Sequence, residues 1–176
     1  MRKLPLRALV ESGVLIALAT LLSTIKVFRM PQGGSVTAGS MIPILLIGLR
    51  WGAGLAVPAG AAYGIVRYFL SGYVVHPLQF LLDYPIAFAA LGLAGLFRSR
   101  PWLGVTVGIA GRFTSHLVAG AVFFAAYAPE GQSPWLYSFA YQAAYLVPEL
   151  LVSLVLVLLL ARTAVLQPER VSGRSS

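Results

Sequence analysis

Residues 76–97 read "HPLQFLLDYPIAFAALGLAGLF", an apolar stretch that holds a single carboxylate, Asp83. A transmembrane helix needs about 20 mainly apolar residues, and Pro77 suits the first turn of such a helix. Because a charge at membrane depth is costly, an acid is retained there when it has a function or a partner. The stretch therefore predicts a transmembrane helix that carries a functional acid.

The composition shows that this stretch is typical of the whole chain. Of the 176 residues, 59% are hydrophobic and 10% are charged, and the mean hydropathy is +0.84, whereas an ordinary soluble domain has about 25% charged residues. Further apolar segments are expected at residues 8–27, 39–49, 54–70, 103–127 and 135–164. We therefore predict an all-α, polytopic membrane protein: six transmembrane helices in one bundle over residues 1–166, and a polar tail at 167–176.

The distribution of basic residues predicts the topology, because Lys and Arg are enriched in the cytoplasmic loops of membrane proteins. Six spans place both termini on one side of the membrane. That side has Arg2, Lys3, Arg7, Arg50, Arg98, Arg100, Arg162, Arg170 and Arg174, whereas the other side has Lys26, Arg29 and Arg67. We therefore expect a multi-pass protein of the plasma membrane with both termini in the cytoplasm.

Several function classes are excluded by what the sequence lacks. The chain has no cysteine, which rules out disulfides and cysteine metal sites. It contains no G-x-x-x-x-G-K-[ST] loop for nucleotide phosphates, no H-E-x-x-H zinc helix and no G-x-S-x-G nucleophile elbow. Its net charge of +8 comes mainly from helix ends, as membrane topology requires. We therefore expect that the protein is not an enzyme and has no cofactor site, metal site or nucleic-acid partner. The composition indicates that the lipid bilayer surrounds it.

Three polar side chains are expected in the same outward half of the bundle. At 1.5 Å per residue, Asp83 lies about 9 Å, His116 about 16 Å and Gln142 about 10 Å below the outer ends of their helices. The sixth helix adds Tyr137, Tyr141 and Tyr145. These groups either satisfy one another inside the bundle or line a ligand pocket, which we favour because so many gather at one depth. A carboxylate in such a site attracts a cation and aromatic rings add cation–π attraction, so the expected ligand is small, flat and cationic or amine-bearing.

Other residues have a structural interpretation beside a functional one. Arg112, one turn inward of His116, and the deeper Glu149 are predicted to form a buried pair below the pocket. Trp135 belongs to the outer aromatic belt or covers the pocket.

Two pairs of small residues stand four positions apart, so each pair shares one helix face: Gly13 with Ala17, and Gly60 with Gly64. Internal packing is the simpler interpretation of both pairs. A docking face for another membrane protein is the alternative.

Four stretches in order along the chain resemble the thiamine-specific substrate-binding subunits, or S components, of energy-coupling factor transporters. They are "MPQGGSVTAGSMIPI" (30–44), "HPLQFLLDYPIAF" (76–88), "GRFTSHLVAGAVFF" (111–124) and "APEGQSPWLYSFAYQAAY" (128–145). The resemblance implies a bacterial cell-membrane protein that captures thiamine with high affinity from outside, for ATP-driven uptake. It also implies partnership with a transmembrane scaffold subunit, docked at Gly13 and Ala17, and with two cytoplasmic ATPases.

The resemblance also assigns site residues one by one. The family's acidic–tyrosine pair falls on Asp83 and Tyr84, and its histidine falls on His116. Its remaining tyrosine and amide positions fall on Tyr73, Tyr137 and Gln142, while Phe124 and Trp135 offer aromatic faces to the ligand.

The chain departs from the family pattern at several of these positions. Some members have Glu at Asp83, and Asn is common at Gln142. Positions that are Trp in some members are Gly34 and Phe124 here, so the stacking on the ligand is expected to differ. A flexible first loop around Gly33 and Gly34 is expected to act as a lid. Two alternatives stay open: an S component for a related vitamin or pyrimidine precursor, and an autonomous secondary transporter of a small organic cation.

Overall fold

The computed structural model describes residues 4–163, and the predicted tail at 167–176 lies outside them. Its elements are α1 (Leu6–Thr24), β1 (Lys26–Arg29), β2 (Ser35–Thr37), α2 (Ile42–Trp51), α3 (Ala53–Ser71), a composite fourth helix, α6 (Pro101–Phe123), the 3-10 turn η3 (Ala125–Tyr127) and α7 (Pro134–Ala161). The fourth helix is made of α4 (Pro77–Leu81), the π-helical turn η1 (Leu82–Ile86), α5 (Ala87–Leu91) and the 3-10 stretch η2 (Gly92–Phe97).

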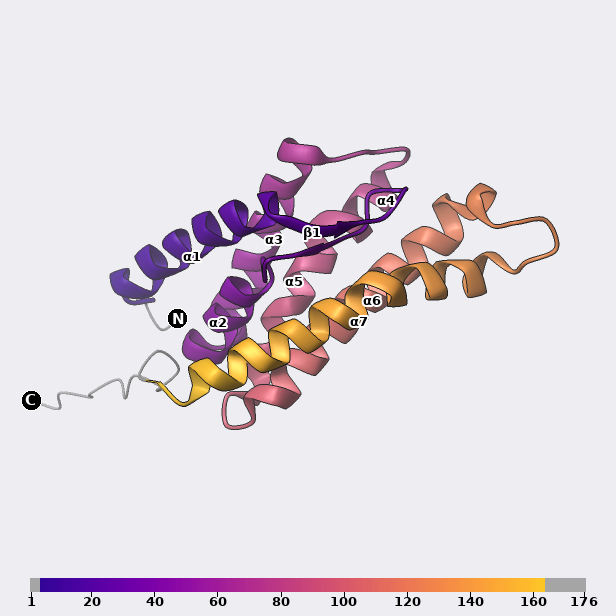
Figure 1. Ribbon diagram of the computed structural model, residues 1–176. Helices are drawn as coiled ribbons and strands as arrows, with labels where there is room; N and C mark the ends of the chain where they lie inside the picture. Colours follow the sequence, from indigo (N-terminus) through magenta and orange to yellow (C-terminus); the bar gives the residue numbers. More distant parts are fainter. Residues whose placement is uncertain (1–3, 164–176) are drawn as a thin grey trace, which may run out of the picture.

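The predicted bundle of six helices is confirmed, with one helix shorter than a full span. Within the described residues, α1, α3, the composite fourth helix, α6 and α7 are long and apolar enough to cross a bilayer, whereas α2 has ten residues. Every residue of α2 from Ile42 to Leu49 is buried, so this short helix packs inside the bundle. The helices run along one another, and α1 begins at the end of the bundle where α7 ends (Figure 1).

The loop after α1 is a β-hairpin rather than an irregular segment. Strands β1 and β2 pair antiparallel, with Phe28 opposite Val36 and Arg29 opposite Ser35. At the turn, Gly33 has a φ of +99°, a left-handed conformation that glycine adopts without a steric penalty. The hairpin runs from the end of α1 toward α4 (Figure 1) and so extends over the end of the bundle away from the start of α1.

The two small-residue pairs have different surroundings. On α3, a Cβ at Gly60 or Gly64 would collide with the backbone of Phe88 or Tyr84, so these glycines let α3 approach the fourth helix closely. On α1, Gly13 and Ala17 are exposed, and nothing lies within 4 Å of a Cβ built at Gly13. Internal packing is therefore the correct interpretation for α3 and the wrong one for α1.

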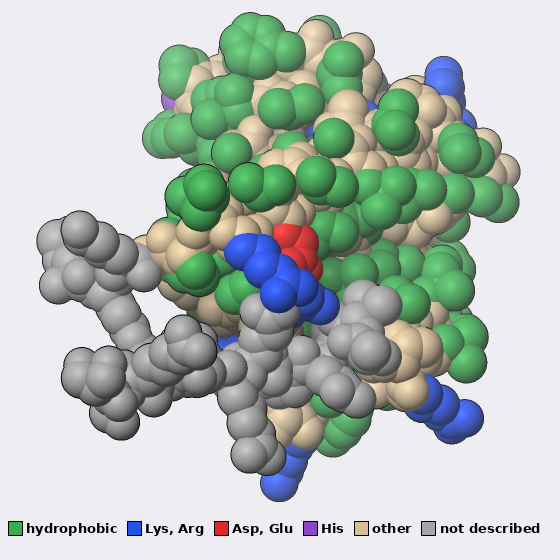
Figure 2. Space-filling view, turned by 90° about the vertical axis from the view of Figure 1, so that its left-hand side faces the viewer, with side chains coloured by type: hydrophobic (Ala, Val, Ile, Leu, Met, Phe, Trp, Pro, Cys, Tyr) green, Lys and Arg blue, Asp and Glu red, His purple; other side chains and the backbone are tan. Residues whose placement is uncertain are grey.

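Basic residues stabilise the end of the bundle where α1 begins. The Arg50 Nε lies 2.7 Å from Glu11 Oε1, which joins α2 to α1. Arg98 donates to the Leu49 and Arg50 carbonyls, at 3.2 and 2.6 Å, which have no partner further along their own helix. In Figure 2, apolar side chains cover much of this face. A basic side chain lies beside one small acidic group near the middle, and other basic side chains lie at the lower edge and the upper right.

Candidate ligand-binding site

A cavity of about 750 Å³ opens between the hairpin, α3, the start of the fourth helix, α6 and α7. Its volume is in the range of sites for small organic ligands. Seven of the predicted site residues line it: Tyr73, Asp83, Tyr84, His116, Phe124, Tyr137 and Gln142. Trp135 is the exception, because it lies outside the cavity lining and its side chain is 52% exposed at the start of α7.

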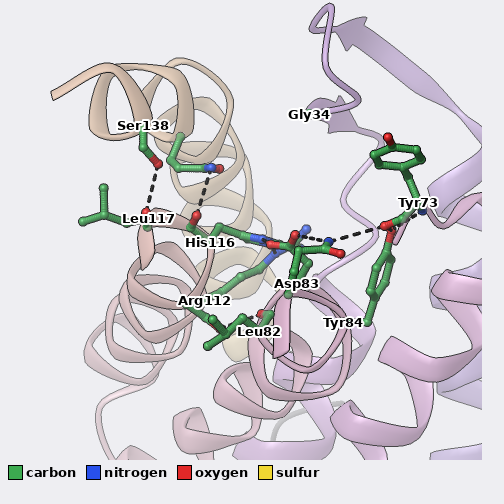
Figure 3. Close-up of polar contacts among 12 residues, drawn as sticks. Gly34, Tyr73, Leu82, Asp83, Tyr84, Arg112, His116, Leu117 and Ser138 are labelled. Carbon is green, nitrogen blue, oxygen red and sulfur yellow. Dashed lines mark hydrogen bonds and ion pairs between the residues drawn. The ribbon is translucent and has the colours of Figure 1, made fainter. Parts of the chain in front are cut away.

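The π-helical turn η1 positions the acid. Pro85 has no N–H to donate to the preceding turn, and its ring displaces the carbonyl behind it. The helix accommodates this with a wider turn over Leu82–Ile86, a feature common at functional sites. In Figure 3, Asp83 points toward His116 on α6, whereas Tyr84 extends toward Tyr73.

Both oxygens of Asp83 accept a hydrogen bond inside the cavity. His116 Nδ1 lies 2.8 Å from Oδ1, and Gln79 Nε2 donates to Oδ2 at 2.5 Å. Gln79 is in turn held by the loop before α4, because its Nε2 lies 3.3 Å from the Tyr73 carbonyl and its Oε1 accepts the Val75 N–H at 3.1 Å. The carboxylate is therefore fixed in direction, and each oxygen keeps a further lone pair for a ligand.

Arg112 contacts His116 rather than Glu149. Its Nε donates to His116 Nε2 at 3.2 Å, and its guanidinium lies 4.2 Å from the centre of the Phe88 ring. Glu149 Oε1 instead accepts hydrogen bonds from the backbone N–H and the hydroxyl of Thr37. The predicted Arg112–Glu149 pair is therefore wrong, because an arginine one turn from His116 on the same helix reaches that ring first.

Helix α7 adds polar groups that hold α6 in place. Gln142 Nε2 donates to the His116 carbonyl at 3.2 Å, and Tyr145 OH donates to Gln142 Oε1 at 2.6 Å. Ser138 Oγ donates to the Leu117 carbonyl at 3.0 Å (Figure 3). These bonds fix the amide of Gln142, whose second N–H has no partner among residues 4–163.

The hairpin is tied to α7 at both ends of β2. At one end, the Gly34 N–H donates to Tyr141 OH at 3.0 Å. At the other, Thr37 N and Oγ1 lie 2.6 and 2.7 Å from Glu149 Oε1. A Cβ at Gly34 would meet the Tyr145 ring, so glycine lets this end of the hairpin lie directly on the tyrosines. Residues 32–35 line the cavity, which places the hairpin as its cover.

Glu149→Leu should loosen the hairpin, because it removes the acceptor of both Thr37 donors. Hydrogen bonds to a charged group are worth about 1.5–3 kcal/mol, so amide hydrogen exchange at residues 35–37 should speed up roughly tenfold or more. Exchange measured by mass spectrometry on the full chain tests this, with Glu149→Gln, which keeps an acceptor oxygen, as the milder control. Equal exchange in both variants and the wild type would contradict the anchoring role.

Comparison with known proteins identifies the family. The model of a family described as thiamine transporter protein (Thia_YuaJ) matches residues 9–167. The thiamine transporter ThiT of Bacillus subtilis strain 168 is 36% identical over 175 residues, covering 89% of this chain and 91% of that protein. The chain belongs to the thiamine transporter family. The ThiT of Lacticaseibacillus paracasei is 36% identical over 118 residues, covering 56% of this chain and 59% of that protein.

A solved structure of a thiamine transporter family member has the same fold. ThiT from Listeria monocytogenes superposes with a TM-score of 0.82 and is 28% identical, over 93% of this chain and 98% of that one. The predicted resemblance is thus confirmed. Membership of this family makes the chain a multi-pass membrane protein and a transport protein, not an enzyme.

At the centre of this site, sequence reasoning missed Gln79 and assigned Arg112 the wrong partner. Gln79 is only 1% exposed and lies one helical turn before Asp83, so an amide at i−4 from an acid in an apolar stretch was the available signal. Arg112 precedes His116 by the same spacing. For both residues the sequence shows the spacing of four positions, but it does not show which side chain is the hydrogen-bond partner until the orientation of each helix face is known.

Basic side chains of the hairpin and α3 contribute to the cavity lining. Lys26 and Arg29 of β1 and Arg67 of α3 all contribute to the lining. Burial, together with the positive charges of Arg29 and Arg67, lowers the pKa of the Lys26 ammonium. Arg67 Nη1 donates to Ser23 Oγ at 2.8 Å, which fixes the guanidinium. The cavity is therefore lined by several basic side chains as well as by the carboxylate of Asp83.

Proposed function

We propose that the cavity binds thiamine and that Asp83 is the group that selects it. The observation that carries this proposal is the orientation of the Asp83 carboxylate, which two donors hold in a cavity of suitable volume. Thiamine has a permanent positive charge on its thiazolium ring and an amine on its pyrimidine ring. An oriented anion in a low-dielectric site is complementary to both features.

The remaining lining residues supply the contacts that a flat ring system needs. Phe124 offers an aromatic face to the cationic ring. Tyr73, Tyr84 and Tyr137 offer hydroxyl groups, and Gln142 offers its second amide N–H to a ring nitrogen. Trp135 has no part in this proposal, because it lies outside the cavity lining.

We further propose that the chain is the high-affinity substrate-binding subunit of an energy-coupling factor importer, with both termini in the cytoplasm. The lack of a nucleotide phosphate loop supports a division of labour with two ATPase subunits. The exposed pair Gly13 and Ala17 supports docking of a transmembrane scaffold on α1, because small side chains permit close helix contact. The excess of basic residues on the side of the termini supports the orientation.

Calorimetry on the purified full chain tests the ligand assignment. Thiamine should bind at least tenfold more tightly than its hydroxymethylpyrimidine half, because that half lacks the permanent charge, and a charge-assisted contact is worth about 1.5–3 kcal/mol. Equal or tighter binding of the pyrimidine alone would instead favour a transporter for a pyrimidine precursor.

The basic lining residues of the hairpin and α3 favour a second ligand in the same cavity. Lys26, Arg29 and Arg67 would meet a phosphate ester on the hydroxyethyl arm of thiamine, and arginine and lysine are well suited to phosphate. Thiamine monophosphate therefore belongs in the same calorimetric series. A phosphate contact predicts that Arg67→Gln weakens the binding of thiamine monophosphate more than the binding of thiamine. A general loss of binding would weaken both equally.

A further inference from the structure

We propose that Arg112 is a positioning residue that keeps His116 neutral, with its proton on Nδ1, so that Asp83 remains an unneutralised anion for a cationic ligand. The inference rests on the proposed function for its consequence, but its structural content concerns the unliganded protein. The sequence suggests a different role for Arg112, as the partner of Glu149, which the structure contradicts.

The hydrogen bonds around His116 determine where its proton lies. The Arg112 guanidinium is always protonated, so its Nε–H is a donor and cannot accept. Because this Nε lies 3.2 Å from His116 Nε2, Nε2 must be the acceptor, without a proton. The remaining nitrogen, Nδ1, then carries the ring proton and donates it to Asp83 Oδ1 at 2.8 Å. The line Arg112–His116–Asp83 is visible in Figure 3.

A protonated His116 does not fit this arrangement. An imidazolium has a hydrogen on both nitrogens, so Nε2–H would point at Arg112 Nε–H, and two cations would lie in contact. Arg112 cannot easily turn away, because its guanidinium lies against the Phe88 ring, and Phe88 is 4% exposed and packs edge-on against Tyr63. The packing of α5 against α3 therefore holds the arginine beneath the histidine.

Among the other charges around His116, the cations act in the same direction as Arg112, whereas two carboxylates act against it. Arg67 of α3 and Lys26 and Arg29 of the hairpin add positive charge to the lining and so also disfavour an imidazolium. Glu149 of α7 favours it, but its carboxylate is bonded to Thr37. From η1, Asp83 favours a charged ring and is the group whose neutralisation Arg112 prevents. The tyrosines of α7 ordinarily keep their protons below about pH 10.

The consequence is that the affinity of the site for a cationic ligand should not fall as the solution becomes acidic. An imidazole in water titrates near pH 6.5, and a charged His116 would form an ion pair with Asp83 and compete with a cationic ligand. With Arg112 in place, His116 should stay neutral, so the pair Asp83–His116 should keep the negative charge of the carboxylate. Without it, the pair should lose this charge as the pH falls, and a cation should bind less tightly.

Nitrogen-15 NMR of the ligand-free, full-length protein tests the inference directly. The chain has two histidines, His76 and His116, so His76→Gln leaves one signal set to assign. The expected spectrum shows a neutral ring with the proton on Nδ1, unchanged from pH 8 to pH 5. A proton on Nε2, or titration of His116 within this window, would overturn the proposal without reference to any ligand.

Affinity measurements on variants test the consequence. In Arg112→Met, the Kd for thiamine should rise about tenfold between pH 7.5 and 5.5, whereas in the wild type it should change less than twofold. Arg112→Lys, which retains the charge, should restore much of the flat profile. Arg67→Met removes a cavity arginine that is not bonded to His116, so it should steepen the profile far less than Arg112→Met. The wild type in the same buffers controls for ionisation of the ligand.

The outcomes separate the two proposals. Failure of the wild type to bind thiamine at pH 7.5 rejects the proposed function and leaves the NMR result to decide the role of Arg112. A flat profile in a folded Arg112→Met that binds thiamine rejects the positioning role alone.

Discussion

Asp83→Asn should raise the Kd for thiamine roughly 10- to 100-fold. Loss of a charge-assisted contact removes about 1.5–3 kcal/mol, which corresponds to this change in affinity. The structure adds a second cost. Asparagine has one acceptor oxygen, so its amide N–H₂ must face either His116 Nδ1–H or the Gln79 Nε2–H group, both of which are donors.

Calorimetry at pH 7.5 measures this effect, with Asp83→Glu as the matched control. Glutamate keeps the charge and both acceptor oxygens and lengthens the side chain by one methylene, so its loss should be smaller than that of asparagine. If a folded Asp83→Asn variant binds thiamine with an unchanged Kd, Asp83 does not contact the ligand as proposed.

Gly64→Leu should prevent the site from forming, because its side chain would enter the backbone of Tyr84 and Pro85. Overpacking usually costs about 1–3 kcal/mol, and a clash with backbone cannot be relieved by a change of rotamer. The fourth helix must then move away from α3 and take Asp83 with it. We expect a lower melting temperature and loss of measurable thiamine binding.

Gly13→Leu is the matched control, since it makes the same change where no atom lies within 4 Å of the new Cβ. Melting temperature and thiamine affinity should stay at wild-type values. If α1 docks a scaffold subunit, uptake by the assembled transporter should nevertheless fall, because a leucine would separate the two helices. A destabilised Gly13→Leu, or a Gly64→Leu that melts and binds like the wild type, would contradict the assignment of the two faces.

Most of the helices could be predicted from the sequence because their apolar segments are long and end in basic or turn-forming residues. Residues 54–70 and 103–127 were placed within a few residues of α3 and α6 on this basis. The depth of Asp83, His116 and Gln142 followed from the helical rise alone. That calculation was sufficient to bring them to one cavity, as the structure shows.

The pairing of side chains could not be predicted, because it depends on how each helix is rotated about its axis. Arg112 and Glu149 lie at compatible depths, yet Arg112 turns toward His116 and Glu149 toward the hairpin. The hairpin itself was missed because its strands have four and three residues, too few for an alternating pattern to be recognised. Much of its position comes from Tyr141 and Glu149 on α7, which are more than 100 residues away.

The wide turn at Leu82–Ile86 has a consequence for how sequences of this kind can change. In a regular α-helix, the direction of the Asp83 side chain would be fixed relative to that of the residues that pack against the glycines of α3. One extra residue in the turn rotates everything after it by roughly 100°, given 3.6 residues per turn. Deletion of a single residue there would force either Asp83 or Phe88 off its partner, so this segment should tolerate substitutions far better than a change in length.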